Sequence, residues 1–139
     1  MTVPRNYHSV ALLLPDGRVF AGGGGLCGTC ATNHADGELF SPPYLYNQDG
    51  SNASRPVIRK APARIDYGSH FDVEVGGGAS DVGSVVLLRS DHNTHSLTAG
   101  DRYVKLAFSR KGSAAGGVEV RMANVPAQAV PGVYMLFVL

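Results

Sequence analysis

The residues best suited to chemistry in this 139-residue chain include an adjacent tyrosine and histidine, Tyr7 and His8. A phenolate and an imidazole can both bind a transition metal, and a phenolate can also accept a proton. Adjacent residues in a strand point to opposite faces, so both reach one metal only at a strand end or bend. A half-exposed strand pair is the more common interpretation of such neighbours, and the two residues alone leave both interpretations open.

A second group of candidates lies in the polar stretch 90–101, between two strand-like runs. His92 and His95 form a His-x-x-His pair there. Residues i and i+3 share a face only on a helix, and this segment has no helical pattern, so the spacing is weak evidence for a metal site. Loops of β-sandwich domains nevertheless often carry function.

Cys27 and Cys30 allow three interpretations. A redox-active Cys-x-x-Cys usually precedes a helix, and no helix is predicted here. A zinc site could add His34, but that makes three ligands where a structural site needs four. A disulfide closing a very short loop is the third interpretation, and it would stabilise the fold only modestly.

Composition indicates an all-β protein of about one domain's length. The chain has 44% hydrophobic residues, 18 glycines and 8 prolines, and glycine and proline disfavour helices. The net charge is +1, and the 12 Lys and Arg are scattered rather than clustered, so we expect no nucleic-acid partner. No apolar run is long enough to span a membrane, and we expect no membrane partner.

The first 40 residues differ from the rest. Two apolar runs flank the turn signal Pro15-Asp16-Gly17-Arg18, which predicts a hairpin, and the second run ends in the glycine tract 22–25. This pattern resembles one blade of a kelch-type β-propeller, which needs neighbouring blades to be stable. We therefore predict a partial last blade over residues 1–40 and a connecting loop over 41–56.

Residues 57–139 are predicted to form an immunoglobulin-like antiparallel β-sandwich. Two segments, 71–75 and 118–122, alternate with period two, as half-buried strands do. Pro131-Gly132-Val133-Tyr134 is similar to a tyrosine corner. The predicted strands are 57–58, 64–65, 71–75, 82–89, 103–108, 118–122 and 133–139.

Ordered similarity to one known family covers nearly the whole chain. The matching segments are Arg5 to Ser9, Leu12 to Phe20, Gly22 to Cys30, Thr32 to His34, Pro43 to Asn47, Arg55-Pro56, Thr94 to Ser96 and Pro131 to Val138. In these segments the chain resembles galactose oxidase and the related glyoxal-oxidase-like radical copper oxidases. The resemblance implies that the chain is the C-terminal portion of such an oxidase.

The resemblance also implies a site. In that family a seven-bladed propeller carries a copper ion, and a loop of the following immunoglobulin-like domain reaches up its axis. Tyr7 matches the axial tyrosine ligand and base, His8 the neighbouring histidine ligand, and His95 the histidine of the long loop. The family has a disulfide where Cys27 and Cys30 lie, which would place the protein outside the cytosol. We interpret His70 and His92 as solvated.

The same comparison predicts what the chain lacks. The cross-linked tyrosine and cysteine of the family lie upstream of the matching segment, and the family's sandwich continues beyond Leu139. We therefore expect the parent protein to oxidise primary alcohols, aldehydes or sugars with O2 to give H2O2, and this chain alone to be inactive. The expected partner is the missing propeller portion. The alternative is a stand-alone immunoglobulin-like binding module for carbohydrate or protein, although the chain has no tryptophan for a sugar platform.

Overall fold

The computed structural model describes residues 3–25, 27–29, 31, 33–77, 79–89, 92–95, 97–112 and 116–139. It confirms the all-β prediction, since the helices in these ranges are two single 3-10 turns, η1 (Pro43–Leu45) and η2 (Ala79–Asp81). Neither of these turns approaches the length of a membrane-spanning helix. The chain divides into two compact units, Met1–Ala53 with Asp91–Gly100, and Ser54–Ser90 with Asp101–Leu139.

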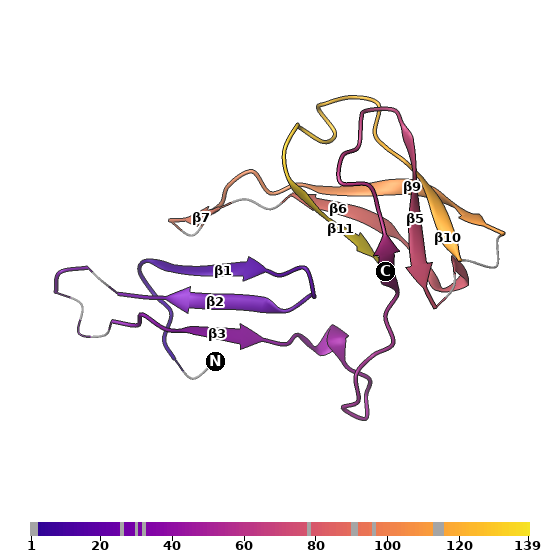
Figure 1. The fold of residues 1–139 in the computed structure, drawn as a ribbon. Helices are drawn as coiled ribbons and strands as arrows, with labels where there is room; N and C mark the ends of the chain where they lie inside the picture. The colour runs from indigo at the N-terminus through magenta and orange to yellow at the C-terminus, as the bar shows by residue number, and fades with distance from the viewer. Residues whose placement is uncertain are drawn as a thin grey trace. The chain divides into compact units, whose positions relative to one another are not determined.

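The first unit is built on an antiparallel sheet with the strand order β1-β2-β3 (Figure 1). Its strands are β1 (Ser9–Leu13), β2 (Val19–Gly23) and β3 (Gly37–Phe40). The turn between β1 and β2 is where the sequence predicts it. Gly17 has a φ of 86°, and the Leu14 N–H donates to the Arg18 carbonyl at 2.8 Å.

β3 was not predicted from the sequence, but a glycine pair explains how this strand joins the sheet. Gly22 of β2 and Gly37 of β3 are register partners. A Cβ atom at either position would come within 2.6 Å of the Phe20 ring. The pair therefore leaves room for that ring to lie across two strands, which a larger residue would prevent.

A two-stranded ribbon from the 91–100 segment also belongs to the first unit. It consists of β7 (Asn93–Thr94) and β8 (Leu97–Thr98), which pair antiparallel. β7 lies beside β1, so residues more than 80 positions apart in the sequence meet in this unit.

The second unit is a strongly curved six-stranded antiparallel sheet, as expected for the predicted immunoglobulin-like domain (Figure 1). The strand order is β11-β6-β9-β10-β5-β4. The strands are β4 (Val57–Lys60), β5 (His70–Gly76), β6 (Val85–Arg89), β9 (Tyr103–Lys111), β10 (Gly117–Arg121) and β11 (Tyr134–Val138).

The two layers of this sandwich are joined by one long strand, β9. The first part of β9, from Tyr103 to Leu106, pairs with β6, and the part from Ala107 to Lys111 pairs with β10. The strand therefore belongs to both layers, and the sheet closes around a single core like an incomplete barrel.

The core of the second unit is mostly valine. Alternate residues of β5 and β10 point inward, and Val73, Val82, Val85, Val118 and Val120 are at most 1% exposed. β-branched side chains fit such a pleated, buried surface well. The period-two pattern of 71–75 and 118–122 is thus confirmed as the inward face of two strands.

Two predicted strands were wrong at least in part. Arg64 and Ile65 are not in a strand, because Ile65 reaches the core from a loop that follows Pro62. The strand predicted from Val82 begins at Val85, since Val82 is buried directly after the η2 turn and its N–H donates to the Ala79 carbonyl at 3.3 Å.

The tyrosine corner is confirmed by a hydrogen bond. The Tyr134 hydroxyl donates to the Val130 carbonyl, four residues upstream, at 2.7 Å. This bond fixes the entry of the chain into β11.

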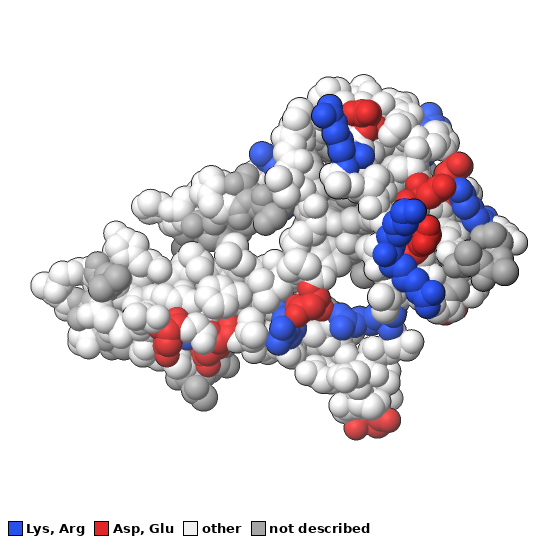
Figure 2. Space-filling model, in the orientation of Figure 1, with Lys and Arg blue, Asp and Glu red and all other residues white. Residues whose placement is uncertain are grey.

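Charged side chains of both signs are interspersed on the face shown in Figure 2. On the second unit this mixing includes cross-strand ion pairs between Lys60 and Glu74 at 3.7 Å and between Lys111 and Asp72 at 2.6 Å. Exposed pairs of this kind contribute little stability, but they place polar groups along the outer face of the sheet.

Candidate metal centre

Tyr7 and His8 lie in the turn that precedes β1, not in the strand itself. Their ring centroids are 3.9 Å apart and the ring planes meet at 39°. His8 has a φ of 63°, in the left-handed region that non-glycine residues rarely occupy. This bend puts both rings on one side of the chain, which resolves the difficulty that adjacent strand residues face opposite ways.

The His8 ring is oriented by a backbone carbonyl. Its Nδ1 lies 3.1 Å from the Gly25 carbonyl oxygen. A carbonyl can only accept, so Nδ1 carries the hydrogen, and in the neutral ring Nε2 is then the nitrogen with the free lone pair. A metal-ligating histidine usually donates a hydrogen bond in this way from the ring nitrogen that does not bind the metal.

Backbone contacts hold the same turn against the glycine tract. The Gly25 N–H donates to the Tyr7 carbonyl at 2.6 Å. Gly23 has a φ of 74°, and a Cβ there would lie 2.7 Å from the His8 carbonyl oxygen. The glycine at position 23 therefore permits the close approach on which the His8 conformation depends.

His95 occupies the turn between β7 and β8. Its φ is 50°, and its Nδ1 lies 2.8 Å from the Thr94 hydroxyl oxygen. Because β7 lies beside β1 within the first unit, the fold brings His95 into the same compact unit as Tyr7 and His8. Three candidates from two distant segments are thus gathered in one unit.

The remaining histidines are placed differently. His70 lies on β5 of the second unit, with Nδ1 3.4 Å from the Glu119 carboxylate. His92 is exposed, and its carbonyl accepts from the Ala99 N–H at 3.0 Å. The His34 Nδ1 is 4.0 Å from the Asp36 carboxylate.

The predicted Cys27–Cys30 disulfide stays a prediction, because Cys30 lies outside the described residues. The zinc alternative involves the same cysteine. Within the described ranges, no three His, Cys, Asp or Glu side chains gather into a group that could hold a metal ion. The candidate set is of another kind, two histidines and a tyrosine.

Sequence reasoning missed Arg5, two residues before Tyr7. Its side chain is only 5% exposed and forms an ion pair with Asp36 at 2.7 Å. An arginine is usually exposed, and a buried one is usually paired. The available signal was the pair of acidic residues, Asp36 and Glu38, at the start of β3.

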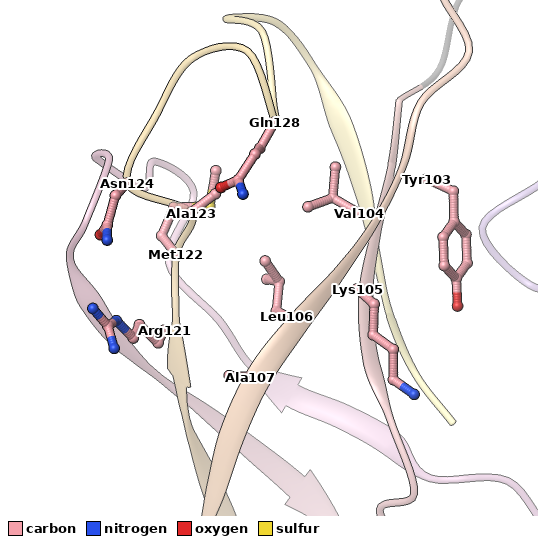
Figure 3. A pocket seen from close by; sticks show the side chains of 10 residues that line it. All are labelled: Tyr103, Val104, Lys105, Leu106, Ala107, Arg121, Met122, Ala123, Asn124 and Gln128. Atoms are coloured by element: carbon pink, nitrogen blue, oxygen red, sulfur yellow. The ribbon is translucent and has the colours of Figure 1, made fainter.

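The second unit has a cavity of about 530 Å³ where β9 diverges from β10 (Figure 3). Leu106 and Met122 are among the residues that line it, and the amide side chain of Gln128 lies above Leu106 in this view. No His, Cys, Asp or Glu is among the described residues that line it. This cavity therefore offers none of the usual side chains that bind a transition metal.

Comparison with known proteins identifies the class. Residues 55–139 match the family model of the galactose oxidase-like, early set domain. The chain therefore belongs to the galactose oxidase-like family, as the sequence resemblance implies.

Individual relatives extend the match over the whole chain. Galactose oxidase of Gibberella zeae is 39% identical over 139 residues, which are 99% of this chain and 20% of that protein. Aldehyde oxidase GLOX of Vitis pseudoreticulata is 39% identical over 147 residues, covering 98% of this chain and 28% of that protein.

A solved structure is also similar, that of a fungal alcohol oxidase of the AA5 family in complex with copper. It has a TM-score of 0.88 and 37% sequence identity, and the match covers 100% of this chain and 29% of that one. The chain thus spans between a fifth and a third of the length of these relatives.

Proposed function

We propose that this chain is the C-terminal portion of a copper-dependent oxidase, and that Tyr7, His8 and His95 are donors to its copper. The observation that carries the proposal is the backbone conformation of the two histidines. Among the described residues, His8 and His95 are the non-glycine positions with positive φ. Left-handed backbone at such residues is strained, and strain of this kind concentrates at functional sites.

The donor set fits copper by its chemistry. Imidazole nitrogen is a common copper ligand, and a phenolate adds an anionic oxygen. His8 has its Nδ1–H engaged by Gly25 and so offers Nε2. Tyr7 is 54% exposed in this chain, which leaves its hydroxyl accessible.

The proposed reaction removes two electrons and two protons from a primary alcohol, giving an aldehyde, and transfers them to O2 to give H2O2. Copper would accept one of the two electrons, and the radical of the family's cross-linked tyrosine and cysteine would accept the other. The role proposed for Tyr7 is that of the base, with the phenolate oxygen taking the hydroxyl proton of the substrate. The histidines would fix the position of that phenolate relative to the metal.

We further propose that the site is incomplete in this chain. The family resemblance puts the cross-linked tyrosine and cysteine outside the present sequence. The first unit also exposes apolar side chains of its sheet and the segment after it, since Leu39, Phe40 and Tyr44 are 52%, 48% and 61% exposed. These features support residues 1–40 as part of a larger kelch-type propeller, whose other blades are the proposed partner. The family resemblance and the predicted disulfide support a protein that acts outside the cell.

Copper titration of the full chain tests the proposal. Electron paramagnetic resonance should show weak Cu²⁺ binding with nitrogen ligands from His8 and His95, and His95→Ala should remove one of them. His92→Ala is the matched control, because His92 lies in the same segment and is exposed. A spectrum unchanged in His95→Ala would contradict the assignment and favour the binding-module alternative.

Activity is measured on the same samples. Copper-loaded chain should produce no peroxide from simple alcohols or aldehydes, because preorganisation of a complete site is missing. Copper-dependent turnover that disappears in His95→Ala would show that the chain is an enzyme by itself.

A further inference from the structure

Arg5 connects three segments of the first unit through one buried guanidinium. Its Nη1 donates to the Gly23 carbonyl at 2.9 Å, to the Asp36 carbonyl at 3.1 Å and to the Asp36 carboxylate at 2.7 Å. Its Nη2 donates to the Glu38 carboxylate at 3.2 Å. The segment before Tyr7, the end of β2 and the start of β3 are therefore tied to one side chain.

Gly23, one of these acceptors, is also the residue against which His8 packs. The Gly23 N–H donates to the Asp36 carbonyl at 3.1 Å, so Gly23 and Asp36 bond to each other as well as to Arg5. The space beside the Gly23 Cα is filled by the His8 carbonyl. Arg5 thus acts on the backbone that holds His8 in its left-handed conformation.

A guanidinium suits this task better than other cations. It is planar, always charged, and presents its N–H donors in a fixed fork. The guanidinium meets a carboxylate of opposite charge here, since the Arg5 side chain is 5% exposed and its Nη1 lies 2.7 Å from the Asp36 carboxylate oxygen. A strained conformation persists only when the surrounding structure over-determines it, and this network provides such a surrounding.

We propose that Arg5 is a positioning residue for Tyr7 and His8, which keeps the His8 ring in the Nδ1–H tautomer and its Nε2 free for a metal. The role of the metal rests on the proposed function; the orientation of the ring does not. Arg5 is separated from the ligands by the Gly23–Asp36 link and acts through it, without touching the metal.

The first test needs no metal. Long-range ¹H–¹⁵N correlation spectra of the full, metal-free chain report the tautomer of each histidine. His8 should be the Nδ1–H form in the wild type and shift toward the Nε2–H form in Arg5→Ala. Arg5→Lys should restore the wild-type tautomer only in part, because an ammonium cannot reproduce the fork.

Arg18→Ala is the matched control. Arg18 also pairs with an aspartate, Asp16, at 2.7 Å, but in the exposed hairpin turn. The Arg18→Ala variant should leave the His8 tautomer unchanged. The proposal is overturned if His8 in the wild type is the Nε2–H form, or if Arg5→Ala and Arg5→Lys both keep the wild-type tautomer.

The second test uses Cu²⁺ alone. Loss of a residue that orients metal ligands typically weakens metal binding about 10–100-fold, and we expect such a loss in Arg5→Ala but not in Arg18→Ala. If Arg5→Ala unfolds the first unit, as judged by the amide signals of β1 and β2, Arg5→Lys carries both tests. Wild-type chain that binds no copper would contradict the proposed function, while the tautomer experiment would still decide the role of Arg5.

Discussion

His8 and His95 lie 87 positions apart in the sequence, yet both have left-handed backbone, with φ values of 63° and 50°. They lie in turns at the ends of β1 and β7, two strands that are neighbours in the first unit. Neither turn uses glycine at this position, although glycine would adopt the conformation without strain. At both positions the chain has a residue with a Cβ atom despite the steric cost of this conformation.

This conformation predicts an unusual order of stabilities at position 95. A left-handed residue with a Cβ costs about 1–2 kcal/mol, so we expect His95→Gly to be more stable than His95→Ala by about 1 kcal/mol. Both variants lose the imidazole, and chemical denaturation of the metal-free chain measures the difference. The controls are Ser109→Gly and Ser109→Ala in β9. In a strand the glycine variant should be less stable than the alanine variant. If the alanine variant is more stable than the glycine variant at position 95 as well, the backbone of His95 is not strained.

The cysteines give a chemical prediction. If Cys27 and Cys30 are bonded to each other, thiol titration of the unfolded, unreduced protein will detect no free thiol. After reduction it should detect both, the full cysteine content of the chain. Finding two free thiols in material prepared under oxidising conditions would refute the disulfide.

The valine core of the second unit should be sensitive to truncation. Val118 is completely buried in β10, and Val118→Ala removes two methyl carbons and leaves a cavity, so we expect a loss of about 2 kcal/mol. Val133→Ala removes the same atoms at a site that is 78% exposed and should change stability by less than about 0.5 kcal/mol. Urea unfolding followed by circular dichroism measures the free energy of unfolding of both variants. Equal effects would contradict the burial described for β10.

Asp36 predicts a dependence of stability on pH. The hydrogen bond from Arg5 lowers the folded-state pKa of Asp36 below its ordinary value of 3.8. The stabilisation is therefore fully present above the ordinary pKa and is lost as the pH falls through the lowered folded value. Asp36→Asn should flatten the stability curve of the first unit in this acidic range. Asp49→Asn is a useful comparison, since hydrogen bonds from Ser51 lower the Asp49 pKa in a separate turn. A curve unaffected by Asp36→Asn would show that the carboxylate contributes nothing in the folded state.

Local patterns in the sequence were sufficient for much of the fold. Turn chemistry located the Gly17 hairpin, and period-two alternation located β5 and β10, because each depends on residues close together in the chain. β3 was not predicted, because it has no local turn or alternation signal of its own and its pairing depends on Gly22 and Gly37, which leave room for the Phe20 ring across the two strands. Ile65 was misplaced because burial by a loop and burial by a strand leave the same apolar signal.

The site was predictable only in its chemistry. The resemblance identified Tyr7, His8 and His95 as candidates, and the structure gathers them in one unit without testing their roles. The bend at His8 could not be predicted, because it depends on the carbonyls and glycines of a distant segment. Arg5 was missed for the same reason, since its four acceptors lie 18 to 33 positions away.

The segment 91–100 belongs by contacts to the first unit, but β6 and β9 of the second unit lie on either side of it in the chain. A genetic exchange that replaced residues 54–139 as a block would therefore replace the early set domain and, with it, the 91–100 segment that carries His95. The two units cannot diverge independently at this point, because a substitution at position 95 would change the donor set proposed for the first unit.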